Sequence, residues 1–270
     1  MEELKTADKL SSLEYWDHVL EEAKLPRVNT RRAYHHSITM DFIDGSIRGQ
    51  EHTSFFEVGC GSSGWLPYFA EKYGWRVSGI DYSEVGCRLA VENLRILGIP
   101  YGDIICKDIF EENCTGGKKY DVVFSYGVIE HFEDPKDIIR IFSSFLNPGG
   151  IMITLVPNLN GSMGWLSRHY IPDIYKMHRV ISKQELRGYH EDNGLKNLKT
   201  NYAGTFTLAV LPLVRSRRWL FREGSLQRKI AIFSFATFDK LASGIFRTFK
   251  INIPTRRFSP YIISIAEKNS

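Results

Sequence analysis

Apolar and polar positions in the middle of the chain alternate between two patterns. Short apolar runs predict strands, and they cover Ser54–Val58, Trp75–Ile80, Asp103–Cys106, Tyr120–Ser125 and Ile151–Val156. Stretches with the spacing of an amphipathic helix separate several of these runs, at Gly64–Tyr73, Val85–Leu97 and Pro135–Leu146. Strands that alternate with helices predict a parallel sheet that helices cover on both faces.

Both ends of the chain depart from this alternation. Residues Ala7–Ile47 have amphipathic helical spacing and predict two helices with a turn near Pro26. Ser182–Asn193 begins with a serine cap and has a glutamate three residues later, which predicts a helix that Gly194 ends. The remaining predictions are a sixth strand at Leu198–Tyr202, a helical insertion at Leu213–Phe249 and a closing strand at Phe258–Ala266.

The composition is that of an ordinary globular protein, because 43% of the 270 residues are hydrophobic and 24% are charged. We divide the chain into an amino-terminal helical lid, residues 1–50, and one larger domain, residues 51–270. The longest apolar stretches fall far short of the ~20 residues that a spanning helix needs. The start of the chain lacks the pattern of a secretory signal, and the four cysteines show no C-x-x-C spacing. We therefore expect a cytoplasmic protein with reduced thiols.

The net charge of +4 conceals an asymmetry along the chain. Residues from Leu195 onward carry a net charge of +11, and those before it carry −7. A basic final quarter is typical of a surface that contacts an anionic substrate, a lipid surface or nucleic acid, although a solvated basic face explains it equally well.

The most informative local pattern is a glycine-rich turn between a predicted strand and a predicted helix. The segment Phe56–Trp65 contains glycines that satisfy the pattern G-x-G-x-x-G, at Gly59, Gly61 and Gly64. Glycines let the backbone approach a ligand closely, and the free N–H groups of the following helix favour anionic groups. The pattern alone fits a nicotinamide cofactor and S-adenosylmethionine (SAM) equally well.

Three acidic residues favour SAM over a nicotinamide cofactor. Glu57 places a carboxylate beside the turn, where it repels a diphosphate but attracts the ammonium and sulfonium groups of SAM. Asp81 ends the next strand and is suited to two ribose hydroxyls. Asp108 ends the third strand with an apolar neighbour, Ile109, and this pair can bind the exocyclic amine of adenine and cover its face.

These motifs together carry a family resemblance. They occur in order as Glu57-x-Gly59-x-Gly61, Asp81, Asp108, the segment Asp121–His131 with Glu-His at its end, and Asn147–Gly150. The chain resembles the class I (Rossmann-like) SAM-dependent methyltransferases, in particular the small-molecule branch. The resemblance is close over Thr53–Val156 and loose over Phe258–Glu267.

The resemblance implies an α/β fold with a doubly wound seven-stranded sheet whose last strand is antiparallel. It implies that SAM binds at the carboxyl ends of the strands, held by Glu57, Gly59, Gly61, Asp81, Tyr82, Asp108 and Ile109, with Ser125 and Tyr126 at the floor of the pocket.

Two histidines are candidates for removing a proton from the acceptor. His131 follows the fourth strand, beside the expected position of the methyl group, although a packing role is an alternative. His178 lies in the segment after the fifth strand, and the related loop of quinone-type O-methyltransferases carries a histidine near the acceptor. His169 is a third candidate. A metal site at Glu130, His131 and His178 lacks compact ligand spacing, so we predict no metal.

The function that we expect is transfer of a methyl group from SAM to a small-molecule acceptor. The favoured acceptor atom is an oxygen of a sugar, lipid, quinone or other secondary metabolite, and nitrogen and carbon remain open. Two alternatives are an NAD(P)-dependent oxidoreductase and a SAM-binding, membrane-associated protein without this activity. The acceptor could be anionic or lipid-linked, and the basic carboxyl-terminal region could contact a membrane. Nucleic acid is not expected, because the fourth strand ends in Ser-Tyr-Gly rather than the Asn/Asp-Pro-Pro-Tyr/Phe motif used on base amines.

Overall fold

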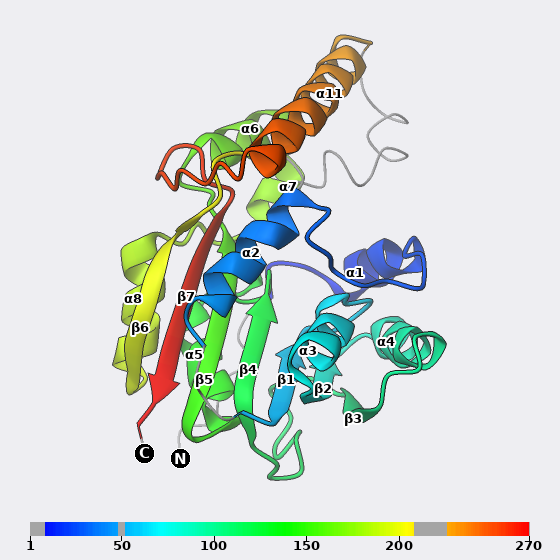
Figure 1. Ribbon diagram of the computed structural model, residues 1–270, viewed down its shortest axis with the longest axis vertical. Helices are drawn as coiled ribbons and strands as arrows, with labels where there is room; N and C mark the ends of the chain where they lie inside the picture. Colours follow the sequence, from blue (N-terminus) through cyan, green and yellow to red (C-terminus); the bar gives the residue numbers. More distant parts are fainter. Residues whose placement is uncertain (1–8, 48–51, 208–225, 270) are drawn as a thin grey trace.

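The fold is built on one seven-stranded sheet, shown in Figure 1. The computed structural model describes residues 9–47, 52–207 and 226–269. The strands are β1 (Ser54–Val58), β2 (Arg76–Asp81), β3 (Tyr101–Cys106), β4 (Tyr120–Tyr126), β5 (Leu146–Pro157), β6 (Leu195–Ala203) and β7 (Tyr261–Lys268). Their order is β3-β2-β1-β4-β5-β7-β6, and β7 is antiparallel to both of its neighbours. The predicted doubly wound sheet with an antiparallel last strand is therefore confirmed.

Helices cover both faces of the sheet because successive side chains of the buried strands point to opposite faces. Phe55 of β1 stacks on Phe69 of one helical layer, with ring centroids 4.2 Å apart. Phe56 points to the other layer and stacks on Tyr120 at 4.3 Å. The first layer contains α2 (Tyr34–Asp44), α3 (Trp65–Tyr73) and α4 (Glu84–Ile96), and the second contains α5 (Pro135–Ser144) and α8 (Lys183–Asp192).

The strand order indicates where a ligand would bind, at the carboxyl ends of the central strands. Strand β1 lies between β2 and β4, so the connections after β1 and after β3 run in opposite directions along the sheet. The carboxyl ends of the strands at such a reversal diverge and leave a crevice, which is where open α/β sheets bind ligands.

The sequence pattern located helices least well in the segments that flank the alternating strands and helices. Two helices that we did not predict, α6 (Ser162–Tyr170) and α7 (Pro172–Lys176), follow β5. Helix α8 begins at the predicted capping box, in which Ser182 and Glu185 bond each other's backbone N–H. Helix α11 (Leu226–Thr248) lies within the predicted insertion, and residues 213–225 of that insertion lie outside the described residues.

The two predicted amino-terminal helices are present, but they contact different parts of the fold. Helix α1 (Leu13–Glu21) contacts α4, next to the carboxyl edge of β2, whereas α2 contacts β6, β7 and α11. Between them, the backbone N–H of Asn29 donates to the Gly64 carbonyl at 3.0 Å, which ties this segment to the glycine-rich turn.

A buried histidine joins α8 to the sheet and predicts a pH dependence of stability. His190 Nδ1 donates to the Leu186 carbonyl at 2.7 Å, and its Nε2 lies 3.0 Å from the Thr154 hydroxyl of β5. Burial lowers the pKa of His190 to about 4. Below about pH 6.5 the unfolded chain binds a proton at His190, whereas the folded chain does not bind one until the pH nears 4. The free energy of unfolding therefore decreases as the pH falls from 6.5 towards 4.

We expect His190→Gln to remove this part of the pH dependence. Between pH 7 and pH 5, the free energy of unfolding should fall by about 2 kcal/mol more in the wild type than in the variant, as measured by urea denaturation. Equal decreases in the two proteins would contradict a neutral, buried imidazole at this position.

Candidate functional site

The glycine-rich turn after β1 needs glycine for two separate reasons. Gly59 and Gly61 have positive φ angles of 72° and 29°, which other residues rarely adopt. A Cβ atom on Gly59 would also lie only 2.8 Å from a methyl group of Val128. Both positions therefore require glycine; Gly59 is exposed at the carboxyl edge of the sheet, whereas Gly61 is buried, with the Leu20 side chain of α1 close to it.

Asp81, at the end of β2, holds this turn in place. One carboxylate oxygen accepts the N–H of Gly61 at 2.8 Å, and the other accepts the N–H of Ser83 at 2.9 Å. Ser83 is the amino-terminal cap of α4. A single carboxylate thus connects the turn after β1 with the first turn of the helix after β2.

Glu57 lies beneath the turn with an unsatisfied oxygen. Its side chain is buried, Oε1 accepts a hydrogen bond from the Ser63 hydroxyl at 2.8 Å, and burial raises the pKa of the carboxyl group. Within the described part of the chain, Glu57 Oε2 and the hydroxyl of Ser125 on β4 have no hydrogen-bond partner. Buried polar atoms normally have partners, so these two acceptors fit a ligand with a positively charged donor, such as the ammonium group of SAM.

Asp108, just after β3, faces a lysine from the start of the described chain. The Lys9 ammonium pairs with the Asp108 carboxylate and lies 4.2 Å from the centroid of the Tyr82 ring. Asp108 and Tyr82 are residues that we expect to bind the adenosine part of SAM, so Lys9 lies where that part is expected. Lys9 is held there by a backbone bridge to Phe132.

The nine predicted cofactor residues all lie at the carboxyl edge of β1 to β4. Ile109 is half-buried and packs on the apolar core. Tyr126, also half-buried, bonds through its hydroxyl to the Tyr261 hydroxyl on β7. The predicted set is therefore brought together, with Lys9, Ser63 and the Val128 contact as additions that the sequence patterns did not indicate.

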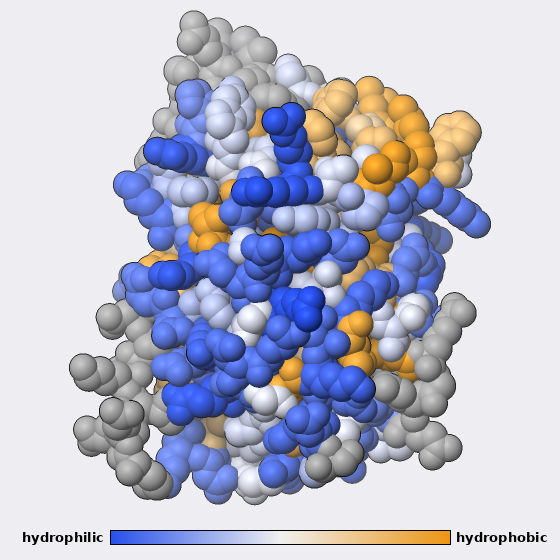
Figure 2. All heavy atoms as spheres, turned by 90° about the vertical axis from the view of Figure 1, so that its left-hand side faces the viewer, coloured by the Kyte–Doolittle hydropathy of each residue, from blue (hydrophilic) through white to orange (hydrophobic). Residues whose placement is uncertain are grey.

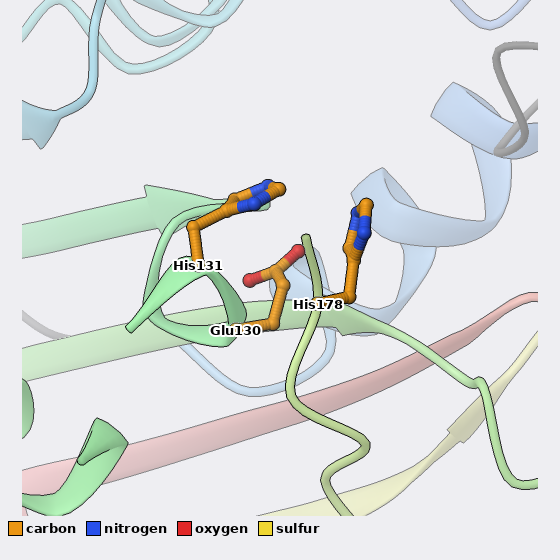
Figure 3. Close-up of side chains that lie close together, drawn as sticks. All are labelled: Glu130, His131 and His178. Atoms are coloured by element: carbon orange, nitrogen blue, oxygen red, sulfur yellow. The ribbon is translucent and has the colours of Figure 1, made fainter. Parts of the chain in front are cut away.

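The two candidate histidines converge with Glu130 beside this edge, as Figure 3 shows. Glu130 and His131 belong to the short helix η1 (Ile129–His131) after β4, and His178 follows α7. The imidazole centroids lie 4.4 Å apart, and one potential ligand atom from each of the three residues lies within 4.8 Å of the others. His169 is exposed on α6 and stacks on Trp165, outside this group.

Backbone carbonyls fix the orientation of both imidazoles. His131 Nδ1 lies 2.8 Å from the Met177 carbonyl, and His178 Nδ1 lies 2.7 Å from the Ile174 carbonyl. A carbonyl oxygen only accepts hydrogen bonds, so both Nδ1 atoms carry the proton and both Nε2 atoms have a free lone pair in the neutral ring. The main chain is anchored too, because Leu10 donates to the His131 carbonyl at 2.8 Å and Arg179 to the Glu130 carbonyl at 2.6 Å.

Burial disfavours charge on all three side chains. It lowers the pKa of His131 to about 3, with a further contribution from His178, and it also lowers the pKa of His178. It raises the pKa of Glu130 to about 8. Both imidazoles are therefore neutral at pH 7, and His131 is a weak base in the free protein.

Residues 17–200, more than half of the chain, match the family model of a methyltransferase domain. The chain belongs to the methyltransferase family. The expectation of a class I SAM-dependent methyltransferase is confirmed, with SAM rather than a nicotinamide as its cofactor.

Curated relatives of this methyltransferase include two enzymes named ubiquinone biosynthesis O-methyltransferase. The protein from Caulobacter vibrioides is 29% identical over 189 residues, which cover 65% of this chain and 70% of the relative. The protein from Acinetobacter baylyi is 28% identical over 149 residues, which cover 54% of this chain and 58% of the relative. A phosphoethanolamine N-methyltransferase of Zea mays is 36% identical over 119 residues, 42% of this chain and 22% of its own length.

Solved structures share the fold at low sequence identity. Magnesium protoporphyrin IX methyltransferase from Synechocystis PCC 6803, with bound SAH, superposes with a TM-score of 0.54 at 15% identity, covering 95% of this chain and 93% of its own. The [4+2]-cyclase SpnF superposes with a TM-score of 0.59 at 15% identity, covering 95% and 92%. These likenesses concern the fold alone.

We expect Asp81→Ala to weaken SAM binding by a factor of about 10 to 100, because it removes a charged acceptor that holds the turn. Calorimetric titration with SAM and S-adenosylhomocysteine measures the change. The matched control is Asp103→Ala, which removes a carboxylate on β3 that pairs with Lys118. Unchanged affinity in Asp81→Ala would contradict the assigned role.

We expect Lys9→Ala to strengthen SAM binding by up to about fivefold, since the cofactor then no longer has to displace a partly exposed ion pair. The same titration measures the affinity for SAM. The control is Lys118→Ala, which breaks the exposed ion pair with Asp103. Weaker binding in Lys9→Ala would show instead that Lys9 contributes to the bound state.

Proposed function

We propose that this methyltransferase transfers the methyl group of SAM to an oxygen atom of a small-molecule acceptor. The observation that supports this most strongly is the group formed by Glu130, His131 and His178, which lies beside the predicted cofactor residues at the same edge of the sheet. Two relatives are named ubiquinone biosynthesis O-methyltransferase, a name that specifies transfer to an oxygen, and this supports the same acceptor atom here.

In this proposal the acidic residues at the strand ends hold the cofactor. Glu57 and Ser125 offer unsatisfied oxygens to the ammonium group, Asp81 faces the ribose, and Asp108 with Ile109 binds the adenine. Gly59 and Gly61 allow close approach of the backbone, and Tyr82 and Tyr126 border the pocket. SAM supplies a methyl group already activated on a sulfonium, so the chain mainly has to align the acceptor.

His131 and His178 are proposed to face the acceptor. Each has a free Nε2 lone pair, which can accept a hydrogen bond from an acceptor hydroxyl and orient its oxygen. The low pKa of His131 favours this orienting role over full removal of the proton before transfer.

Helix α1 is proposed to form the lid of this site. The Trp16 ring meets the His131 ring edge-on, with centroids 5.0 Å apart, and Asp17 accepts a hydrogen bond from the Ser83 hydroxyl. The residues that precede the main domain thus contact both the acceptor side and the cofactor side.

We expect transfer of radiolabel from SAM to a phenol or catechol acceptor, and a loss of about tenfold or more in kcat/KM in His178→Ala with unchanged affinity for SAM. The loss follows from removal of an acceptor contact. His18→Ala, which changes an exposed histidine of α1, is the control. Label on phosphoethanolamine instead would indicate N-methylation, and SAM binding without transfer to any acceptor would count against the proposed activity.

We further propose that the carboxyl-terminal region places the enzyme on an anionic lipid surface. Four apolar side chains on and just after α11 are between 52% and 72% exposed and recur every three or four residues: Phe238, Leu241, Ile245 and Phe249. Apolar residues gather at this upper end of the molecule in Figure 2. Basic residues accompany them, namely Lys240, Arg247, Lys250, Arg256 and Arg257. No helix among the described residues is long and apolar enough to cross a membrane.

An apolar helix face with flanking basic residues is the pattern of a helix that lies in a membrane interface. A lipid-linked acceptor would then be within reach of the site. The four cysteines are free thiols, which suits a cytoplasmic location at the inner face of the membrane.

We expect Leu241→Asp with Ile245→Asp to reduce co-sedimentation with phosphatidylglycerol vesicles by about tenfold or more, because the exposed face then loses apolar area and gains negative charge. Ile96→Asp, at an exposed position on α4, is the matched control. Equal binding by all three proteins, or equal binding to phosphatidylcholine vesicles, would contradict the proposal.

A further inference from the structure

We infer that Glu130, His131 and His178 form a binding site for a divalent transition-metal cation such as Zn²⁺. Two imidazoles and one carboxylate are a common ligand set for such ions in catalytic sites, where open coordination positions remain. The three side chains converge from two separate segments, and their potential ligand atoms lie within 4.8 Å of one another. This inference reverses the sequence-based prediction of no metal, which rested on the lack of compact ligand spacing, because Glu130 and His178 are distant along the chain but meet in the fold.

The hydrogen bonds around the imidazoles are those of metal ligands. A histidine that binds a metal usually donates its other N–H to a carbonyl or carboxylate, which fixes the ring and the tautomer. Both rings follow this rule, through the Met177 and Ile174 carbonyls, and both present an unprotonated Nε2. The protein thus holds two neutral imidazoles in the form that a cation requires.

Glu130 supplies a second, independent observation. Its side chain is only 2% exposed, and its Oε2 has no hydrogen-bond partner within the described part of the chain. A buried carboxylate oxygen without a partner is costly, and a cation bound by the neighbouring imidazoles would satisfy it.

A general-base arrangement fits these contacts less well. A histidine that removes a proton becomes positively charged, and a carboxylate on its Nδ1–H then stabilises that charge. Here both Nδ1–H groups face backbone carbonyls, which carry no net charge. These surroundings favour a neutral ligand over a proton acceptor.

With the cation bound, both Nε2 lone pairs would coordinate it instead of accepting a hydrogen bond from the acceptor. An open position on the cation would then take the acceptor oxygen, a part of the inference that rests on the proposed function. Binding of a hydroxyl to the cation favours loss of its proton to solvent, which leaves an oxygen anion on the metal. No oxidant or reductant is needed, because the cation keeps its charge throughout.

The experiment is calorimetric titration of the full chain with Zn²⁺, after removal of bound metal by a chelator and removal of any histidine tag. The background carries Cys106→Ser, because thiolates also bind Zn²⁺ and Cys106 is the exposed cysteine. Co²⁺, whose absorption spectrum reports nitrogen and oxygen ligands, is titrated in parallel. We expect one ion per chain and a loss of affinity of at least about 100-fold in Glu130→Gln and in His178→Ala.

The controls distinguish a folding defect from loss of the metal site, and loss of the metal site from loss of methyl transfer. His18→Ala should bind Zn²⁺ like its parent, and Glu130→Gln keeps the shape of the side chain if His178→Ala fails to fold. Absent Zn²⁺ binding, or equal binding in the parent and Glu130→Gln, would overturn the metal site even where SAM binds and methyl transfer proceeds. Tight Zn²⁺ binding without methyl transfer would leave the metal site standing and remove the proposed function instead.

Discussion

The proposed cofactor site depends on one interaction, the pair of hydrogen bonds that the Asp81 carboxylate accepts. By accepting N–H groups from Gly61 and Ser83, this carboxylate fixes the turn after β1 relative to the helix after β2. These two segments come together only because β1 and β2 are parallel neighbours whose carboxyl ends lie at one edge. The sheet register therefore determines where the carboxylate lies, and the carboxylate then determines the shape of the turn.

The proposed acceptor side is positioned in a different way. Glu130, His131 and His178 are positioned by backbone groups rather than by the sheet, through the carbonyls of Met177 and Ile174 and the N–H of Arg179. Their geometry thus depends on how α7 and the segment after it pack against η1. The cofactor side uses strand ends common to the fold, whereas the acceptor side uses added segments, which is where members of one fold differ in chemistry. The superposition on a [4+2]-cyclase illustrates how far such chemistry can differ.

This division explains which parts the sequence could predict. Glu57, Asp81 and Asp108 each stand at a strand end in a short local motif, so strand periodicity and a few spacings were enough to locate them. The pairing of Lys9 with Asp108 joins residues 99 positions apart, and no local pattern reports such a contact. His178 could be selected by residue type, but its convergence with Glu130 required the packing of α6 and α7, two helices that the sequence pattern did not predict.

The distribution of unsatisfied groups connects the two halves of the site. Glu57 Oε2 and Ser125 Oγ lie on the cofactor side and Glu130 Oε2 on the acceptor side, all three buried and without partners within the described chain. Each of these oxygens destabilises the fold when no ligand is bound, because no hydrogen bond compensates for its removal from water. Four other buried side-chain atoms of the described chain also lack partners, so a missing partner alone does not mark a site. It supports one here because these three atoms belong to motif residues at the strand ends, where positively charged ligand groups would satisfy them, an ammonium on one side and a metal cation on the other.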